Sequence, residues 1–209
     1  MRTRVKICGF TRVEDAVCAA ELGVDAIGLV FYPPSPRHVD IETAAAIVRA
    51  LPAFVSVVAL FVDAEPAQVS DVLSMVRVDC LQFHGNEQAD ACRSYGKPYL
   101  KAVRMRNQVV LADVERQYHD ACGLLLDAYH PGMQGGTGSA FDWDLIPQNR
   151  ILPLILAGGL TIENIGRAIQ IVKPYALDVS SSVEAGKGIK DADKMAAFIR
   201  KTNQEIEKI

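Results

Sequence analysis

Residues 5–23 read VKICGFTRVEDAVCAAELG, in which a short apolar run is followed at once by an amphipathic segment. The run at residues 5–8 has the length and composition of a buried strand. Four apolar residues then recur at helical spacing and form one stripe: Val13, Ala16, Val17 and Ala20. Thr11 and Glu14 have the spacing of a capping box, which predicts that the helix begins directly after KICGF. The stretch therefore predicts one β-α unit with a tight turn between its strand and its helix.

The same order of a short apolar run and an amphipathic segment recurs along the chain. The candidate strands are residues 5–8, 26–31, 55–61, 80–84, 99–103, 123–128, 152–158 and 176–180. Further helical stripes lie between them: Val69, Val72, Leu73 and Val76; Ile162, Ile165, Ile169 and Val172; Met195, Phe198 and Ile199. Eight units give a repeat of roughly 26 residues, close to the minimum for a strand, a helix and two turns. The pattern predicts an α/β fold, a (β/α)8 TIM barrel, with an open doubly wound sheet as the alternative.

The chain is expected to form a single domain over residues 1–209, because no linker-like tract or charge run divides it. One unit is irregular. Residues 127–151 show no full helical pattern, only a glycine-rich loop and the short segment FDWDLI at 141–146. We therefore expect the helix after the sixth strand to be reduced to a short segment. So long a connection inside a compact domain is usually functional.

Charge and composition limit the classes of partner that the chain is expected to bind. The formal net charge of -3, with the basic residues spread along the chain, disfavours nucleic-acid binding. No apolar stretch suits a signal peptide or a membrane span, so we expect a cytoplasmic protein that does not bind a membrane. The five cysteines form no CxxC pair and no familiar zinc spacing, which predicts reduced thiols and no metal site. Four of them fall on predicted buried faces: Cys18, Cys80, Cys92 and Cys122.

In a (β/α)8 barrel the active site is built from the C-terminal strand ends and the loops that follow them. The polar residues at those ends are Cys8, the loop at 32–38, Gln82, His84, Asp127, Gly158, Gly159 and Ser180 to Ser182. Alternation along the sixth strand separates Leu125 and Asp127 from Leu124 and Leu126. Asp127 is thus expected to point into the barrel mouth, where a carboxylate is either paired or catalytic.

The same alternation places Lys6 and Cys8 inward on the first strand, and Asp178 inward on its neighbour in a closed barrel. Lys6 and Asp178 are therefore expected to form an interior ion pair, with a catalytic lysine as the alternative. By its residue type alone, Cys8 is expected to be a core residue. Its position at the C-terminal end of the first strand, at the mouth of the barrel, fits a catalytic role equally well.

Two neighbouring loops suggest a phosphate site. The stretch ILAGGLTIEN, residues 155–164, leads from a strand through Gly158 and Gly159 toward a helix, so that backbone N–H groups can bind an anion. Ser180 and Ser181 in DVSSSVEAGKG, residues 178–188, supply hydroxyl groups and further N–H groups next to it. Loops after the seventh and eighth strands are the usual phosphate site of such barrels.

Two other side chains are candidate ligand contacts. Arg37 lies in a loop stiffened by three prolines and is either a surface cation or a guanidinium that binds a substrate carboxylate. His84 is either a substrate contact or a histidine whose hydrogen bonds are satisfied within the protein.

Taken together, these segments resemble the phosphoribosylanthranilate isomerase family of tryptophan biosynthesis. The resemblance rests on KICGFTRVEDA, GLVFYPPSPRHV, LQFHGNE, LLLDAYHPGMQGGTGSAFDW, LAGGLTIENI and LDVSSSVEAGKGIKD, which occur in the family's order over nearly the whole chain. One position departs from the family pattern: Ser182 stands where SSGVE has glycine, which alters the site if that position needs a positive φ or close approach of a phosphate.

The resemblance implies an aldose-ketose isomerisation, an Amadori rearrangement, without metal or cofactor. It gives Asp127 the role of general acid and Cys8 that of general base. It places the substrate's carboxylate on Arg37, other substrate contacts on Gln82 and His84, and the phosphate on Gly158, Gly159, Ser180 and Ser181. The expected partner is a phosphorylated small molecule, and the chain is expected to be a monomer or a homodimer.

Three alternatives remain open at the level of sequence. Other phosphate-binding barrels, such as indole-glycerol-phosphate synthase or a ribulose-phosphate epimerase, use a lysine and glutamate or paired aspartates with a metal. A barrel that binds a phosphorylated ligand without catalysis would keep the two loops but lose the acid and the base. A related aminoaldose of histidine biosynthesis also remains open as a second substrate.

Overall fold

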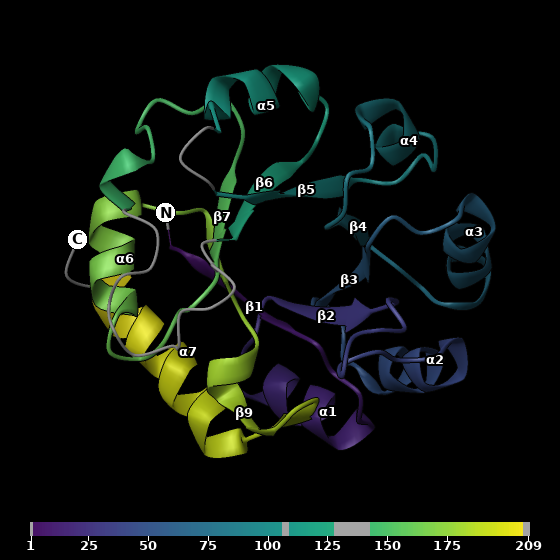
Figure 1. The fold of residues 1–209 in the computed structure, drawn as a ribbon. Coiled ribbons are helices and arrows are strands. Elements are labelled where there is room, and N and C mark those ends of the chain that lie inside the picture. The colour runs from purple at the N-terminus through teal and green to yellow at the C-terminus, as the bar shows by residue number, and fades with distance from the viewer. Residues whose placement is uncertain (1, 106–108, 128–142, 207–209) are drawn as a thin grey trace.

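Eight parallel strands close into a barrel, which confirms the (β/α)8 prediction and removes the open-sheet alternative (Figure 1). The computed structural model describes residues 2–105, 109–127 and 143–206. The strands are β1 (Arg4–Cys8), β2 (Ala26–Val30), β3 (Ser56–Phe61), β4 (Cys80–Phe83), β5 (Tyr99–Arg104), β6 (Gly123–Asp127), β7 (Leu154–Ala157) and β8 (Ala176–Val179). Pairing of β1 with β8 closes the barrel and places Lys6 opposite Asp178.

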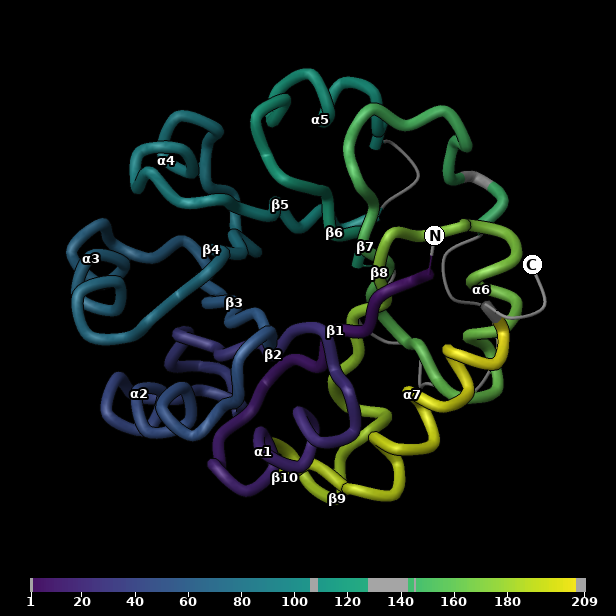
Figure 2. Tube along the Cα trace, turned by 180° about the vertical axis from the view of Figure 1, so that it is seen from behind, coloured from purple at the N-terminus to yellow at the C-terminus, as the bar shows by residue number. Residues whose placement is uncertain are grey.

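Helices surround the strands on the outside, as the ribbon and the view from behind both show (Figures 1 and 2). They are α1 (Val13–Glu21), α2 (Ile41–Ala50), α3 (Pro66–Met75), α4 (Ala89–Arg93), α5 (Leu111–Gln117), α6 (Ile165–Val172) and α7 (Ala192–Ile206). Between β6 and β7 the described residues contain one short 3-10 helix, η1 (Trp143–Leu145). Over the described residues of this unit the predicted short segment is confirmed, while the glycine-rich loop, residues 128–142, lies outside the described residues.

Alternate residues of each strand face two different cores. Leu124 and Leu126 belong to the large outer core between strands and helices, and Leu125 belongs to a smaller core inside the barrel. Above that inner core, Cys8 packs with Val30 and Leu60. The period-two alternation expected for β6 is thus confirmed, and it separates the side chains that hold the helices from those that face the barrel axis.

Two helix starts differ from the predictions. Helix α1 begins after Arg12, with no side-chain cap, because the Thr11 hydroxyl donates to the carbonyl oxygen of Gly188 at 2.6 Å. The predicted capping box is therefore wrong. Helix α6 begins at Ile165, because residues 161–164 form a turn in which the amide of Thr161 donates to the side chain of Asn164 at 2.9 Å. Ile162 consequently lies outside the helix and is exposed, contrary to the predicted stripe.

A short element after β8 was not predicted. The 3-10 helix η2 (Ser181–Val183) leads into a two-stranded antiparallel hairpin of β9 (Glu184–Gly186) and β10 (Ile189–Lys190). Both views place this hairpin beside the start of α1 (Figures 1 and 2). The contact of Thr11 with Gly188 joins the two, so the loop after β8 is tied to the loop after β1.

The five cysteines all lie in described stretches and all are free thiols. Cys92 is buried and Cys18 and Cys80 are half-buried, but Cys122 is exposed. The prediction of a buried face for Cys122 is wrong because this residue lies just before β6, at the N-terminal end of the strand, where its side chain is exposed. Within the described helices, none has the length and the apolar composition needed to cross a bilayer.

Candidate active site

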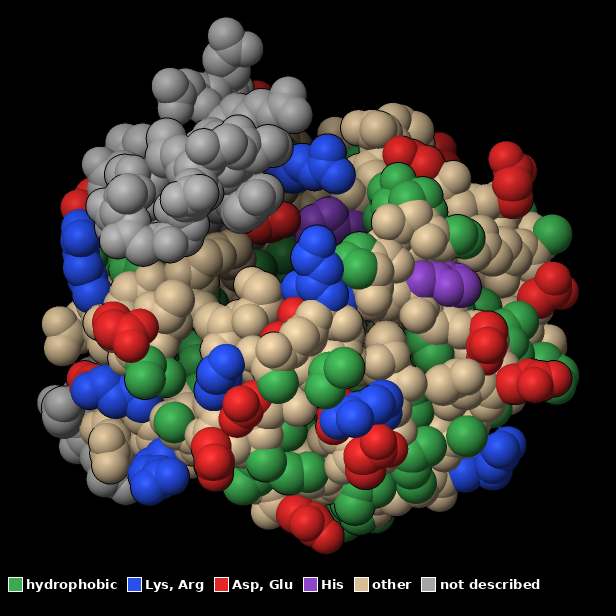
Figure 3. Space-filling model, turned by 60° about the horizontal axis from the view of Figure 1, so that its bottom comes forward, with side chains coloured by type: hydrophobic (Ala, Val, Ile, Leu, Met, Phe, Trp, Pro, Cys, Tyr) green, Lys and Arg blue, Asp and Glu red, His purple; other side chains and the backbone are tan. Residues whose placement is uncertain are grey.

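A cavity of about 560 Å³ opens at the C-terminal ends of the strands. It is lined by all nine site residues predicted from the sequence: Cys8, Arg37, Gln82, His84, Asp127, Gly158, Gly159, Ser180 and Ser181. Its size suits a small-molecule ligand. Figure 3 shows basic side chains and a histidine grouped beside a hollow in the surface. The fold thus brings together residues that are up to 173 positions apart, from Cys8 to Ser181.

The inner wall at β1 contains a buried charge pair beside the thiol. Lys6 Nζ donates to Asp178 Oδ1 at 2.9 Å, which confirms the predicted interior ion pair. Gly28 on β2 lies opposite Cys8, and a Cβ atom there would come within 2.6 Å of Cys8 Sγ and 3.0 Å of Lys6 Nζ. Glycine at this position therefore makes the room that both side chains occupy. Sequence reasoning missed Gly28, because its importance depends on the register between β1 and β2.

The charges around Cys8 oppose one another. Burial raises the pKa of the thiol; Lys6 and Lys190 act to lower it, and Asp178 acts to raise it. The net result is a raised pKa, so the thiolate form of Cys8 is less favoured than that of an ordinary thiol. Burial is the largest single influence on Lys6 and disfavours its charge, but Asp178 and Cys8 together outweigh burial and raise the Lys6 pKa to about 12. The lysine remains cationic while its charge is shared with the carboxylate.

The opposite wall carries a short polar chain. His84 follows β4, and its Nε2 atom lies 3.3 Å from Asp127 Oδ2 at the end of β6. Its Nδ1 atom lies 3.2 Å from the amide nitrogen of Gln82. Because that nitrogen is only a donor, Nδ1 accepts and Nε2 carries the proton toward Asp127. The Asp127 side chain remains 22% exposed, so its carboxyl group is accessible from the cavity.

Arg37 reaches the cavity from the proline-stiffened loop after β2, but one edge of its guanidinium is already engaged. Nε and Nη2 donate to the two carboxylate oxygens of Glu184 at 2.8 and 2.7 Å. This bidentate hydrogen bond raises the pKa of Arg37 and fixes the plane of its guanidinium. Burial would raise the pKa of Glu184, but the hydrogen bonds from Arg37 and Lys190 hold it below its usual value.

The two loops expected to bind phosphate lie side by side on the cavity wall. Gly158 and Gly159 have φ values of 80° and 64°, a backbone conformation that favours glycine. Ser182 does not have a positive φ, and its hydroxyl donates to the carbonyl oxygen of Leu160 at 2.6 Å. The serine at this position therefore joins the two loops without backbone strain.

Besides Gly28, two charged residues near the cavity were not found from the sequence, Glu184 and Lys190. Both lie in the hairpin after η2, whose sequence EAGKGIK was interpreted only as a source of N–H groups. The buried state of both side chains depends on the contact between the hairpin and β1. A weak signal was present, because an acidic and a basic residue flank a glycine-containing turn.

The donor groups of the cavity are oxygen, nitrogen and one thiol spread over several strands. Within the described stretches, no three His, Cys, Asp or Glu side chains are grouped as metal ligands would be. The arrangement places a carboxyl group and a thiol on facing walls, with the Arg37 guanidinium, serine hydroxyl groups and the glycine loop on the same lining.

Comparisons with known proteins agree with this geometry. The family model of N-(5'phosphoribosyl)anthranilate (PRA) isomerase matches residues 5–201. The N-(5'-phosphoribosyl)anthranilate isomerase of Nitrosococcus oceani is 57% identical over 200 residues, which cover 96% of this chain and 97% of that protein.

Two solved structures extend the match to three dimensions. A phosphoribosyl anthranilate isomerase in complex with reduced 1-(o-carboxyphenylamino)-1-deoxyribulose 5-phosphate is 41% identical, has a TM-score of 0.84, and covers 97% of this chain and 99% of its own. Monomers of the dimeric enzyme from Thermotoga maritima are 40% identical, with a TM-score of 0.83 and coverage of 96% and 98%. By sequence and by fold, the chain belongs to the phosphoribosylanthranilate isomerase family.

Proposed function

We propose that Asp127 and Cys8 are the general acid and general base of the isomerisation, acting from opposite walls of the cavity. The chain is an isomerase of tryptophan biosynthesis that converts N-(5-phosphoribosyl)anthranilate to 1-(2-carboxyphenylamino)-1-deoxyribulose 5-phosphate. The observation that supports the two roles is the convergence of a carboxyl group from β6 and a thiol from β1 on one cavity. An aldose-ketose isomerisation needs one group that gives a proton and one that takes a proton.

The first step opens the sugar ring. The Asp127 carboxyl group donates a proton to the ring oxygen, the bond between that oxygen and C1 breaks, and the nitrogen lone pair forms the C=N bond of a protonated Schiff base. His84 orients Asp127 from its Nε2 side. The exposed edge of the carboxyl group can therefore face the substrate.

The second step moves the double bond. Cys8 acts in its thiolate form, which burial opposes and the cations Lys6 and Lys190 favour. The thiolate removes the proton from C2, the electron pair of that C–H bond forms the C1=C2 bond, and the nitrogen regains its lone pair. The enolamine then tautomerises: the C2 hydroxyl loses its proton, C1 gains one, and the ketone results. Substrate and product are isomers, so these proton transfers balance without an oxidant, a reductant or a cofactor.

Substrate binding is assigned to the remaining lining residues. The Arg37 guanidinium binds the anthranilate carboxylate, and the loops with Gly158, Gly159, Ser180 and Ser181 bind the phosphate through backbone N–H and hydroxyl groups. Gln82 Oε1 is buried and has no hydrogen-bond partner among the described residues. Such an atom costs roughly 1–3 kcal/mol, and a substrate hydroxyl would offset this cost by donating to it.

The deciding experiment is an isomerase assay that follows the loss of phosphoribosylanthranilate in Cys8→Ser and Asp127→Asn variants. We expect kcat to fall by roughly a hundredfold or more in each, with the far-UV circular dichroism of the native protein retained. Arg37→Ala should mainly raise KM. Near-native turnover in Cys8→Ser or Asp127→Asn would remove that residue from its assigned role.

We also propose that the chain forms a homodimer through the end of the barrel opposite the cavity. Phe54, in the loop before β3, is fully exposed and has a φ of 70°, which is a strained backbone for a phenylalanine. Ile151 and Tyr175, which precede β7 and β8 at the same end, are also exposed. Light scattering should give the mass of a dimer and, for Phe54→Glu, that of a monomer. A monomeric native chain would disprove the proposal.

A further inference from the structure

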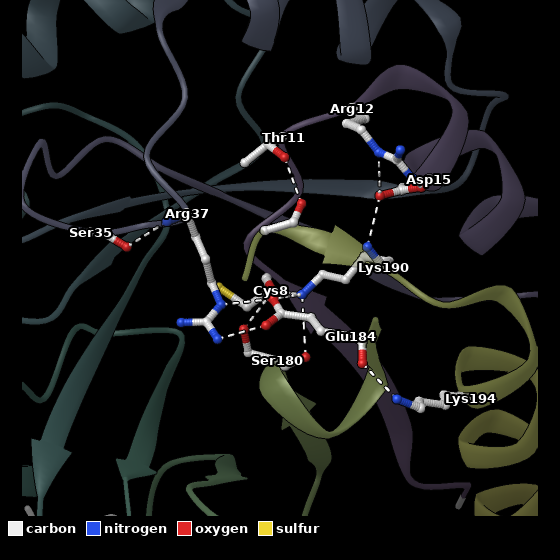
Figure 4. Close-up of polar contacts among 11 residues, drawn as sticks. Cys8, Thr11, Arg12, Asp15, Ser35, Arg37, Ser180, Glu184, Lys190 and Lys194 are labelled. Carbon is white, nitrogen blue, oxygen red and sulfur yellow. Dashed lines mark hydrogen bonds and ion pairs between the residues drawn. The ribbon is translucent and has the colours of Figure 1, made fainter. Parts of the chain in front are cut away.

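The side chain of Lys190, in β10, is completely buried, at 0% exposure. Its Nζ atom donates to the carbonyl oxygen of Cys8 at 2.6 Å, to that of Ser180 at 3.3 Å and to Glu184 Oε1 at 2.9 Å (Figure 4). The Ser180 hydroxyl donates to the same Cys8 carbonyl at 2.9 Å. Two donors from the loop after β8 therefore hold the backbone of the residue that carries the thiol.

Glu184 connects this contact to Arg37. One carboxylate oxygen accepts from both Lys190 Nζ and Arg37 Nε, and the other accepts from Arg37 Nη2. Figure 4 shows the third guanidinium nitrogen of Arg37 turned away from Glu184. A continuous chain of charged hydrogen bonds thus runs from Arg37 through Glu184 and Lys190 to the main chain of Cys8.

The hairpin that carries both residues is itself fixed. The amide of Lys190 donates to Asp15 Oδ2 at 2.8 Å, and Lys194 Nζ donates to the carbonyl oxygen of Glu184 at 2.7 Å. Thr11 donates to Gly188 at the hairpin turn. Contacts with α1, with Thr11 in the loop before it and with α7 therefore leave Glu184 and Lys190 little freedom to move.

A buried ion pair contributes little net stability to a fold, because the loss of hydration of both ions offsets most of their attraction. An apolar pair of similar volume would serve stability equally well. What the charged pair adds is direction: it fixes the plane of the guanidinium and the position of the Cys8 carbonyl relative to each other.

We propose that Glu184 and Lys190 are positioning residues, which hold the carboxylate-binding Arg37 and the base Cys8 in one fixed geometry. The inference rests on the roles proposed above for Arg37 and Cys8. Glu184 acts through Arg37, and Lys190 acts through the backbone of Cys8. The loop after β8 thus contributes to proton abstraction and to carboxylate binding as well as to the phosphate site.

A double-mutant cycle tests the Glu184 part. Glu184→Gln should raise KM by roughly tenfold, because the Arg37 guanidinium would no longer be held in its binding orientation. The fall in kcat should be smaller. In an Arg37→Ala background, the same Glu184→Gln change should alter kcat/KM by less than about twofold, because its target is gone. Losses that multiply in the double variant would overturn the inference for Glu184, and so would unchanged kinetics in Glu184→Gln.

A paired replacement tests Lys190 and separates positioning from stability. Lys190→Met alone leaves Glu184 without its buried cation and is expected to unfold readily. The double variant Glu184→Leu with Lys190→Met leaves no unpaired charge between the two positions and should restore the thermal midpoint. We expect kcat, which Glu184→Gln alone should lower less, to remain at least about tenfold below the native value in that stable double variant. Full recovery of activity together with stability would show a structural role only.

Glu205→Gln is the matched control, because Glu205 is a buried carboxylate in α7 that pairs with Lys201 at 2.8 Å outside the cavity. It should lower the thermal midpoint without changing KM or kcat. The single variants Arg37→Ala and Cys8→Ser separate the two possible failures. If both keep native kinetics, the proposed roles are wrong; if both lose activity while the cycle is additive, only the positioning inference is wrong.

Discussion

The two walls of the cavity differ in how their charges are held. The wall of β8, β1 and the hairpin contains two buried ion pairs, Lys6 with Asp178 and Lys190 with Glu184. The wall of β4 and β6 has the Asp127 carboxyl group at 22% exposure, with His84 at 3.3 Å. The proposed base, Cys8, therefore lies in a packed cluster of charges, whereas the proposed acid, Asp127, lies at the rim of the cavity.

This difference has a chemical reason. A general base that removes a proton from carbon must be held in line with that C–H bond, and a displacement of about 1 Å can cost a hundredfold in rate. A general acid for a ring oxygen needs a proton and access to the substrate, which a rim position provides. The difference also predicts that substitutions on the two walls will affect stability very differently.

The largest expected effect is that of Lys6→Met on stability. Removing one partner of a buried ion pair leaves Asp178 buried and uncompensated, and we expect a loss of about 3–5 kcal/mol in the free energy of unfolding. Urea denaturation measures it. The double variant with Asp178→Leu should recover most of the loss, and a cost below about 1 kcal/mol for Lys6→Met would place this pair among the weak surface pairs.

Gly28→Ala should have the next largest effect, because the new methyl group would meet the sulfur of Cys8 and the ammonium of Lys6. We expect a loss of about 1–3 kcal/mol from overpacking, together with a fall in kcat as the thiol is displaced. Gly186→Ala is a suitable control, since nothing lies within 4 Å of a Cβ atom at that position. Equal behaviour of the two variants would show that the close approach at Gly28 does not matter.

The pH dependence of alkylation compares the buried thiol of Cys8 with the exposed thiol of Cys122. Because burial raises the Cys8 pKa, its reaction with iodoacetamide should rise with pH on the alkaline side of an ordinary thiol. Cys122 is an internal control: a hydrogen bond from Cys80 lowers its pKa, so it should react at lower pH. Peptide mass spectrometry resolves the two. Reaction of Cys8 at a lower pH than Cys122 would contradict the charge balance described for the β1 wall.

The smallest effect on stability is expected for His84→Asn, on the wall of β4 and β6. His84 is half-buried and contacts Asp127 at the rim, so its loss should cost less than about 1 kcal/mol in unfolding free energy. Turnover should fall by roughly tenfold, because Asp127 loses a partner that orients it. A stability loss as large as that of Lys6→Met would remove the distinction between the two walls.

Much of this molecule was predictable from local pattern. The eight apolar runs, the inward face of β6 and the pairing of Lys6 with Asp178 follow from alternation and from barrel closure. These features depend on neighbours along one strand or on a register that closure imposes, so the sequence contains the required information.

The exact starts of α1 and α6, and the contacts between loops that are far apart in the sequence, were not predictable. Thr11 was expected to cap α1, but its hydroxyl bonds to Gly188 in a hairpin 177 residues away. A local rule names a donor and an acceptor that are close in sequence, and a partner brought near by the fold competes for the same hydroxyl group.

The sequence by itself determined the barrel, the family and the residue types that converge on the cavity, because periodicity and motifs are properties of the chain alone. Only the tertiary structure decided which groups surround each of them: Gly28 beside the thiol, Glu184 on the Arg37 guanidinium and Lys190 on the Cys8 carbonyl. Burial and charge at a site depend on distances across the fold. For that reason the sequence identified the cysteine, while the structure showed that its pKa is raised and its backbone is held from β10.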